Sequence, residues 1–410
     1  MLISHPRIMY QTWMTSLESV CCALASLFPK FFCSILLTWS YYVFMMEAVY
    51  NGLVISRNKS VLAYTASIVA TVLYGLCLYT YFKVVVAGPG SPLDFEELRI
   101  NNIDSLANRR RSENPFDTNT TPTTLDQTNE SETHLLAEEM NTQAPEVPPL
   151  DYVKMYTVKQ KRSAPVAYRY CLKCSCWKPD RCHHCSSCKK CVLRMDHHCP
   201  WFASCIGFYN QKFFIQFLTY LAIYSGLVFV VTTSLLWKFF TQEMYKDGEY
   251  LSLSLVFLFV VSLSFFFAVS GFAIFTSYLV VVNTTTIEVQ ESKWNVKRNG
   301  KSNGAFQYEF DQSGGNSGEN GSKKSISSNI FDLGYKRNWT SIMGETWIEW
   351  LLPINSTSDK LEDEYKNGIN FEINHEAYQQ WVHDTQLQDQ LNQQVEDYVK
   401  RTRAERESYV

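Results

Sequence analysis

The sequence lacks an excess of basic residues. Its 37 lysines and arginines are outnumbered by 40 aspartates and glutamates, which gives a formal net charge of −3 at pH 7. A nucleic-acid-binding domain needs a clearly basic surface, so we expect no nucleic-acid partner. A cleavable signal peptide is also lacking, because the first apolar run begins late and no small-residue cleavage pattern follows it. We therefore expect that run to remain in the protein.

Charged residues are nearly absent from four long apolar runs, at about 31–50, 61–82, 213–237 and 251–282. The one exception is Glu47, near the end of the first run. Each run is long enough to cross a hydrocarbon core of about 30 Å, which takes roughly 20 apolar residues. The runs predict an α-helical polytopic membrane protein with four transmembrane helices, the alternative being buried helices of a soluble core. A channel or transporter is disfavoured, because such pathways normally contain ionisable residues within the membrane.

The distribution of charge between the runs predicts their orientation. The long connection 83–212 carries Lys83 and Lys212 at its membrane edges and many more basic residues between them. The connection 241–250 has three acidic residues and one lysine, although two basic residues in the short loop after the first run oppose this pattern. Cytoplasmic connections carry an excess of lysine and arginine. We therefore expect residues 83–212 and both termini to face the cytosol.

Changes of composition divide the chain. Residues 102–150 are rich in Asn, Thr, Glu and Pro and have few large apolar side chains, which predicts a disordered linker. The expected order is a cytosolic N-terminal lead (1–30), two membrane helices (31–82), a rigid Gly- and Pro-containing turn (83–101), the linker (102–150), a cysteine-rich domain (152–212), two further membrane helices (213–282), a short region after them (283–298), a flexible linker (299–328), an interfacial C-terminal segment (329–354) and a cytosolic tail (355–410). In the tail, Leu387, Leu391, Val395 and Val399 form a narrow apolar stripe that predicts an amphipathic helix used for packing, with a specific partner as the alternative.

The cysteine-rich domain has the composition of a metal-binding module. Nine of the thirteen cysteines and four of the eight histidines lie within residues 171–205. In the reducing cytosol this density favours metal ligands over disulfides. Two tetrahedral structural zinc ions need eight ligands, and the spacing supplies Cys171, Cys174, His184, Cys185, Cys188, Cys191, His198 and Cys205. Cys176 and Cys182 remain without a predicted role.

Zinc is expected to fold this domain at the membrane surface. The segment has too few apolar residues to fold unaided, and zinc binding in small modules supplies about 10–16 kcal/mol of folding free energy. Only residues 206–212 separate the last predicted ligand from the third apolar run. The domain must therefore lie against the bilayer.

Cys199 is a candidate nucleophile. Asp196 and His197 precede it closely, and a cysteine with an adjacent histidine and carboxylate has the composition of an activated thiolate. By analogy with Ser-His-Asp chemistry, His197 would accept the thiol proton and Asp196 would orient the imidazole. His198, one residue further, would point elsewhere and bind zinc. The alternative is that Cys199 is one more zinc ligand.

Several motifs then coincide. DHHC at 196–199 lies in a domain ending in PWFASCIGFYN, TTIE follows the fourth run at 285–288, and NIFDLGYKRNWTSIMG occupies 329–344. Together they resemble the DHHC family of integral-membrane protein S-acyltransferases, the last two as its TTxE and C-terminal motifs. The turn GPGSPLDF resembles the fungal vacuolar-type members in particular. Ser204 and Gly88 depart from the family, which commonly has Asn and Asp there.

The resemblance implies a protein S-palmitoyltransferase. Cys199 would attack the thioester of palmitoyl-CoA and then pass the acyl chain to a cysteine of a cytosolic or membrane-associated protein, in ping-pong catalysis. The implied partners are long-chain acyl-CoA, protein substrates with cytosolic cysteines, and membrane lipid. The vacuole membrane is favoured, with Golgi and endoplasmic reticulum as alternatives. Asn338 would tie the C-terminal motif to the fourth membrane helix. A non-enzymatic, zinc-bearing membrane adaptor is the main competing hypothesis.

Further residues are expected to hold the acyl-CoA or the active site around it. Trp201 would line the acyl path, with simple packing as the alternative. Lys178 and Arg181 are candidates for the phosphates of CoA, since arginine forks onto phosphate and lysine offers a point charge, although a solvated basic face would look the same. Thr286 and Glu288 would brace the site from the cytosolic end of the fourth helix, or would simply cap that helix.

Overall fold

The computed structural model covers the whole chain and describes residues 27–55, 59–101, 148–156, 168–241, 251–290, 329–355, 365, 367–380, 382–383, 390, 394 and 397–402. Most of the predicted N-terminal lead and of the two predicted linkers lies outside these residues. The same is true of Leu387, Leu391 and Val395 in the predicted apolar stripe.

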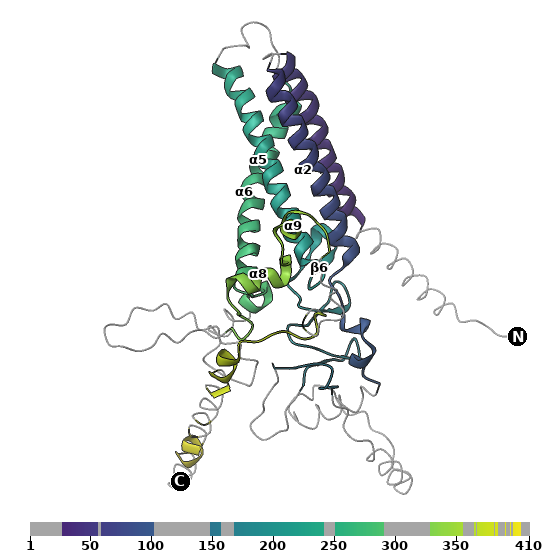
Figure 1. Ribbon diagram of the computed structural model, residues 1–410, viewed down its shortest axis with the longest axis vertical. Helices are drawn as coiled ribbons and strands as arrows, with labels where there is room; N and C mark the ends of the chain where they lie inside the picture. Colours follow the sequence, from purple (N-terminus) through teal and green to yellow (C-terminus); the bar gives the residue numbers. More distant parts are fainter. Residues whose placement is uncertain are drawn as a thin grey trace, which may run out of the picture.

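Among the described residues, four helices are long and apolar enough to cross a membrane, which agrees with the predicted number: Leu27–Ile55, α2 (Ser60–Ala87), α5 (Gln211–Thr241) and α6 (Leu253–Val281). They have 28 to 31 residues and mean hydropathies of 1.4 to 2.5. At about 1.5 Å per residue they exceed a hydrocarbon core of about 30 Å. The first three extend a few residues beyond the predicted apolar runs, whereas α6 lies just inside its predicted run. Figure 1 shows them as a bundle with the strands gathered near one end.

The first helix contains Glu47, the one charged residue in the four apolar runs. Its second half, η1 (Phe44–Ile55), is π-helical, and Glu47 accepts a hydrogen bond of 3.2 Å there from Asn51 Nδ2. In the first half of this helix, the hydroxyl groups of Ser40 and Tyr224 lie 3.2 Å apart, which links the first helix to α5 inside the bundle. The carboxylate thus has a local partner within its own helix.

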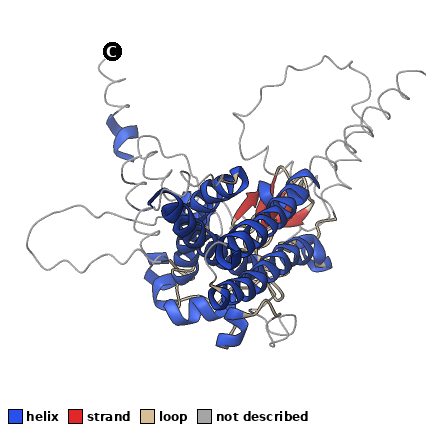
Figure 2. Ribbon diagram, turned by 90° about the horizontal axis from the view of Figure 1, so that it is seen from above, coloured by secondary structure: helices blue, strands red, loops and turns tan. Residues whose placement is uncertain are grey.

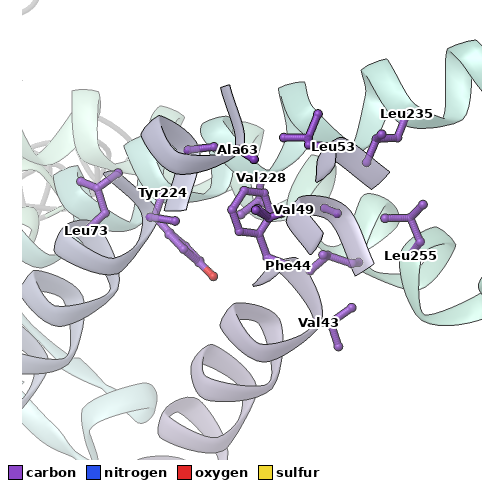
Figure 3. Packing of buried hydrophobic residues seen from close by; sticks show 14 of the residues in the cluster. Val43, Phe44, Val49, Leu53, Ala63, Leu73, Tyr224, Val228, Leu235 and Leu255 are labelled. Carbon is purple, nitrogen blue, oxygen red and sulfur yellow. The ribbon is translucent and has the colours of Figure 1, made fainter. Parts of the chain in front are cut away.

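Buried apolar side chains from all four helices form the bundle core. Phe44 of the first helix, Val228 of α5 and Leu255 of α6 belong to one cluster (Figure 3). Gly226 lets α5 approach α6 closely, because a Cβ atom there would lie 2.9 Å from the ring of Phe266. α5 contacts the first helix, α2 and α6. Seen from above, the strands lie to one side of the helices (Figure 2). The bundle therefore has a core of its own, separate from the cysteine-rich domain.

The cysteine-rich domain consists of three antiparallel hairpins in series, which we call the zinc module (residues 170–206). The strand pairs are β1 (Tyr170–Cys171) with β2 (Cys176–Trp177), β3 (His183–Cys185) with β4 (Lys190–Val192), and β5 (His197–Cys199) with β6 (Ser204–Ile206), and η4 (Pro200–Phe202) lies in the last loop. Isolated two-stranded hairpins are at best marginally stable in water. Strands of two or three residues therefore need another source of stability, and the chain leaves β6 directly for α5.

The turn after α2 fixes the approach of the chain to the zinc module. Gly88 and Gly90 have φ angles of 63° and 81°, a region that favours glycine. A Cβ atom on Gly90 would also lie 2.5 Å from the ring of Tyr209. Two short 3-10 turns follow, η2 (Pro92–Asp94) and η3 (Glu96–Leu98). The departure from the family at Gly88 thus suits the local backbone.

After α6 the chain folds back along the bundle. The short helices α8 (Tyr335–Met343) and α9 (Trp347–Leu351) lie beside α5 and α6 (Figure 1). Asn338 Nδ2 donates a hydrogen bond of 2.8 Å to the carbonyl oxygen of Val281, which confirms its predicted link to the fourth membrane helix. All four apolar side chains of α9 are exposed, while Gln216 Nε2 donates to three carbonyl groups around the end of this helix. An interfacial position for α9 remains a prediction.

Residues 367–374, in the predicted tail, pack against the zinc module. Ile369 is fully buried in a cluster that includes Trp177 of β2. Asn370 Oδ1 accepts a hydrogen bond of 2.7 Å from the backbone amide of Lys154, and Asn370 Nδ2 donates to the carbonyl oxygen of Tyr152. This part of the tail therefore belongs to the folded domain.

Candidate active site

The eight predicted zinc ligands gather into two groups of four. Within each group the ligand atoms all lie within 4.8 Å of one another, and the groups are Cys171, Cys174, His184 and Cys191, and Cys185, Cys188, His198 and Cys205. The distances from histidine Nδ1 to the three sulfur atoms are 3.2–3.8 Å in the first group and 3.3–3.7 Å in the second. A zinc tetrahedron with Zn–S of about 2.3 Å and Zn–N of about 2.0 Å has S···N edges of about 3.5 Å. Both donor sets fit zinc.

The register of the hairpins explains how each group forms. His184 faces Cys191 across β3 and β4, and His198 faces Cys205 across β5 and β6. Each of these pairs completes a group begun by the Cys-x2-Cys pair of the preceding hairpin. The two groups therefore connect the three hairpins in series, and the second group holds the hairpin that carries Cys199.

Cys176 and Cys182, which the sequence left without a role, lie around the first group. Both are fully buried in a cluster with Cys191. A hydrogen bond to Cys191 raises the pKa of the Cys176 thiol, and burial together with a similar bond raises the pKa of Cys182. Their thiols thus lie beside a ligand residue, in the position of the outer groups that tune metal sites.

The three predicted catalytic residues lie together at the start of the third hairpin. His197 Nδ1 donates a hydrogen bond of 2.7 Å to Asp196 Oδ2. Burial would lower the pKa of His197, but its hydrogen bonds with Asp196 and Cys199 outweigh burial and raise that pKa to about 9. Successive side chains of a strand point to opposite faces, so His198 turns away toward the second ligand group. The arrangement can hold the proton of the Cys199 thiol on an oriented imidazole.

Thr286 of the TTIE motif braces the catalytic carboxylate. Its backbone amide donates a hydrogen bond of 2.8 Å to Asp196 Oδ1, and its hydroxyl group donates to the Asp196 carbonyl oxygen. These contacts use the oxygen atoms of Asp196 that His197 leaves free, since His197 bonds to Oδ2. Of the roles predicted for Thr286, the contacts match bracing of the site.

Arg181 does not occupy the exposed position that a CoA phosphate contact requires, which corrects the sequence-based prediction. The residue is only 1% exposed. Its Nε and Nη2 atoms donate to the Glu288 carboxylate at 2.7 and 2.9 Å, because a guanidinium fork matches a carboxylate in two-point geometry. Burial would raise the pKa of Glu288, but Arg181 holds it below its usual value. The pair joins the zinc module to the TTIE segment that follows α6. Lys178 is half-buried and remains a candidate phosphate contact.

Asn283 is a linking residue beside the site that the sequence analysis missed. Its Oδ1 accepts hydrogen bonds from Arg181 Nη1 at 2.8 Å and from Arg194 Nη2 at 3.0 Å, and its Nδ2 donates to the carbonyl oxygen of Phe331 at 2.6 Å. It thereby joins two buried arginines of the zinc module to the C-terminal motif. Its place two residues before TTIE is the only sequence signal.

The Glu288→Gln protein is expected to be less stable by about 3–5 kcal/mol, because Arg181 would keep its charge in a buried site without a counter-charge. Thermal unfolding of the purified protein in detergent, with zinc content measured alongside, checks this. Glu372→Gln is the matched control, since Glu372 pairs with Arg337 at the surface, where such pairs contribute about 0–1 kcal/mol. Equal unfolding temperatures for the two variants would contradict the prediction.

Cys199 lies between the zinc module and the bundle. It is 5% exposed, in a cluster with apolar residues from α2, α5 and α6. Tyr81, at the end of α2, donates a hydrogen bond of 2.8 Å to the carbonyl oxygen of Trp201, while the Trp201 side chain is 58% exposed. Trp201 is therefore not a packed core residue. The sequence signal for Tyr81 is an aromatic residue at the end of the second run, just before the connection that carries the cysteine-rich domain.

Comparison with known proteins tests the family expectation. A family model described as DHHC palmitoyltransferase matches residues 165–293. Over the full chain, the protein is 54% identical to palmitoyltransferase PFA3 of Debaryomyces hansenii, of which the match covers 98%. The chain belongs to the DHHC palmitoyltransferase family. It is also 44% identical to palmitoyltransferase PFA3 of Candida albicans, with 96% of both chains covered, and 32% identical to that of Saccharomyces cerevisiae, with 91% of this chain and 93% of the relative covered.

Family membership confirms the predicted class of activity. The protein is an acyltransferase of the protein S-palmitoyltransferase type and an integral membrane protein, with a zinc-binding DHHC domain. The interpretation as a non-enzymatic adaptor is not supported by these relatives, which are named as palmitoyltransferases.

Proposed function

We propose that the protein transfers a long-chain acyl group, palmitoyl in the first instance, from acyl-CoA to Cys199 and then to a cysteine of a protein substrate. The observation that carries this assignment is the division of the cysteines. Eight ligand residues meet in two groups, whereas Cys199 lies outside both and beside the Asp196–His197 pair. The alternative that Cys199 is a further zinc ligand has no counterpart among the described residues.

The chemistry follows from these positions. His197 accepts the proton of the Cys199 thiol, and the thiolate attacks the carbonyl carbon of the acyl-CoA thioester. The carbon–sulfur bond to CoA breaks, and the CoA thiolate leaves with the proton from His197. In the second step His197 takes the proton of the substrate thiol, whose sulfur attacks the acyl-enzyme and releases Cys199. Asp196 orients the imidazole and stabilises its charged form in both steps.

The surroundings of Cys199 suit a substrate that is apolar at one end and charged at the other. The apolar cluster around Cys199 includes residues of the helix bundle. Transfer of a hydrocarbon chain from water to such surroundings is favourable in free energy. The exposed Trp201 lies next to this cluster, and we assign it to the acyl path. The CoA group would remain in water, where Lys178 is the residual candidate for its phosphates.

Zinc in the two groups is proposed to be structural. Every ligand is a cysteine or histidine and each group has four, which is the closed coordination of structural sites. Bound zinc supplies folding free energy and fixes β5. The chemical steps belong to Cys199, His197 and Asp196.

In the His197→Ala protein we expect the acylation of Cys199 to slow by about 10²–10⁴-fold at neutral pH, the usual contribution of a positioned acid–base group. The difference in acylation rate between this variant and wild type should become smaller as the pH rises, because a thiol ionises without a base at alkaline pH. Rapid-quench measurement of the acyl-enzyme across pH checks this, with two zinc ions retained per chain. His375→Ala, which alters an exposed histidine, is the control. Unchanged rates for His197→Ala would remove it as the base.

We further propose that the active site faces the cytosol and that the vacuole membrane is the site of action. The basic residues of the 83–212 connection support the orientation, and the resemblance of the GPGSPLDF turn to vacuolar-type members supports the compartment. Fluorescence of the tagged chain at the Golgi or endoplasmic reticulum would contradict the compartment. Acyl-exchange profiling of the proteome with and without the gene would identify the protein substrates.

A further inference from the structure

The three hairpins of the zinc module repeat with an interval of 14 residues. The residue pairs that close their loops are Cys171 with Cys176, Cys185 with Lys190, and Cys199 with Ser204. Each pair encloses a loop of four residues, and each step from one pair to the next is 185 − 171 = 199 − 185 = 14 residues. The hairpin of the nucleophile is therefore in register with the two hairpins before it.

The backbone of the three loops repeats as well. The last loop residue is left-handed in each case, with φ angles of 49° at Ser175, 54° at Lys189 and 45° at Ala203. This conformation is unfavourable for residues other than glycine. Its recurrence at the same place in three loops indicates one shared loop shape, which positions the first and fourth residues of each Cys-x2-Cys pair.

The ligand positions of the first two hairpins can then be followed into the third. The first hairpin uses Cys171 and Cys174, and the second uses Cys185 and Cys188. Fourteen residues further, the third hairpin has Cys199 at the first position and a phenylalanine, Phe202, at the second. In addition, no fourth hairpin follows to add a histidine and a cysteine, because the chain enters α5.

We propose that the catalytic hairpin is a third zinc knuckle in which Phe202 replaces the second ligand, and that Phe202 is the positioning residue that keeps Cys199 free of metal. The proposal rests on the function assigned to Cys199 above. It explains why the nucleophile lies one residue after a zinc ligand. The module holds Cys199 with the same loop that elsewhere holds a metal, and Phe202 stands where the second sulfur donor of that loop would be.

The packing of Phe202 shows what this side chain does in place of a ligand. It is 1% exposed, and its ring centroid lies 4.8 Å from that of Tyr81 and 5.4 Å from that of Phe217. It belongs to the same buried cluster as Cys199. Phe202 therefore fastens the loop to α2 and α5 and gives the nucleophile an apolar neighbour, where a thiol would give a soft metal a second donor.

The test introduces a thiol at position 202, where the first two hairpins have their second cysteine ligand. In the full-length Phe202→Cys protein, phenylarsine oxide is expected to block palmitoyl-CoA-dependent acylation at concentrations about tenfold or more below those needed for wild type, because the second As–S bond forms intramolecularly. Arsenic exchanges its oxygen for the two sulfurs and releases water, and 2,3-dimercaptopropanol should restore the activity. Phe202→Ser is the matched control for lost packing. Trp201→Cys places the added thiol one residue earlier and so controls for its position in the loop. Both should show the sensitivity of wild type.

Mass spectrometry separates this proposal from the assigned function. If Phe202→Cys forms a cyclic arsenic adduct that joins positions 199 and 202, the knuckle is supported even where no variant transfers an acyl group. If wild type is acylated on Cys199 but Phe202→Cys is no more sensitive to phenylarsine oxide than Phe202→Ser, the proposal is overturned.

If Phe202→Cys does not accumulate with two zinc ions, substitutions of Ala203 test the shared loop shape instead. Ala203→Gly should then match or exceed the unfolding temperature of wild type and Ala203→Val should fall below it, and equal temperatures would overturn the shared loop shape.

Discussion

The Cys199→Ser protein is expected to form no acyl-enzyme with palmitoyl-CoA while it retains two zinc ions per chain. A serine hydroxyl at this position has the same hydrogen-bonding partner, His197, but is a far weaker nucleophile than a thiolate. Loss of a covalent nucleophile removes the whole two-step route, so we expect a decrease of about 10³-fold or more in transfer to a protein substrate. Radiolabelled or alkyne-tagged palmitoyl-CoA, followed by gel analysis and zinc measurement, checks both parts.

The zinc measurement distinguishes the two interpretations of Cys199. Were Cys199 a ligand, its replacement would open a metal site, and zinc would be lost together with activity. The eight-residue arrangement predicts instead that both ions remain. Cys77→Ser is the control for cysteine content, since Cys77 is fully buried in the bundle core, distant in sequence from the module. Acylation that persisted on another cysteine would show that the nucleophile lies elsewhere.

The membrane helices and the ligand set were predictable because their physical requirements are visible in the sequence. A hydrocarbon core demands long uncharged runs, and the four runs became four helices. Tetrahedral zinc demands four soft donors at short spacing, and the eight residues chosen for it gather in two groups of four. The Asp196–His197 hydrogen bond was also foreseeable, since the two residues adjoin Cys199 in the chain.

The contacts between distant segments were not predictable in the same way. Arg181 looked like a surface cation, because nothing near KPDR in the sequence marks Glu288, 107 residues later, as its buried partner. The packing of residues 367–374 on the module was not predicted either. Ile369, Phe371 and Ile373 alternate with polar residues, but so short a pattern does not indicate the surface on which they pack. These interactions depend on how the chain returns from the bundle, which spacing along the sequence does not encode.

Removal of zinc is expected to abolish acylation of Cys199 and to unfold the zinc module while the helix bundle persists. The module would lose about 10–16 kcal/mol of folding free energy, which is comparable to the whole stability of a typical domain, about 5–15 kcal/mol. Its hairpins are two or three residues long on each strand and have little else to hold them. The bundle has a separate apolar core, so its helices do not depend on the metal.

Chelation of the purified protein, followed by limited proteolysis and circular dichroism, separates these effects. Cleavage should begin within residues 170–206, with little loss of helical signal. Restored zinc should restore acylation. Full activity at less than one zinc ion per chain would contradict a structural role for both groups.

The neighbours His197 and His198 provide the sharpest form of this prediction. They are consecutive residues of β5 and point to opposite faces, so the same substitution should have different consequences. His198→Ala removes a ligand of the second group, and we expect the loss of one zinc ion and of the fixed position of Cys199. His197→Ala leaves both ions in place and removes only the base. Equal zinc contents in the two variants would contradict the assignment of His198 to zinc binding and of His197 to proton transfer.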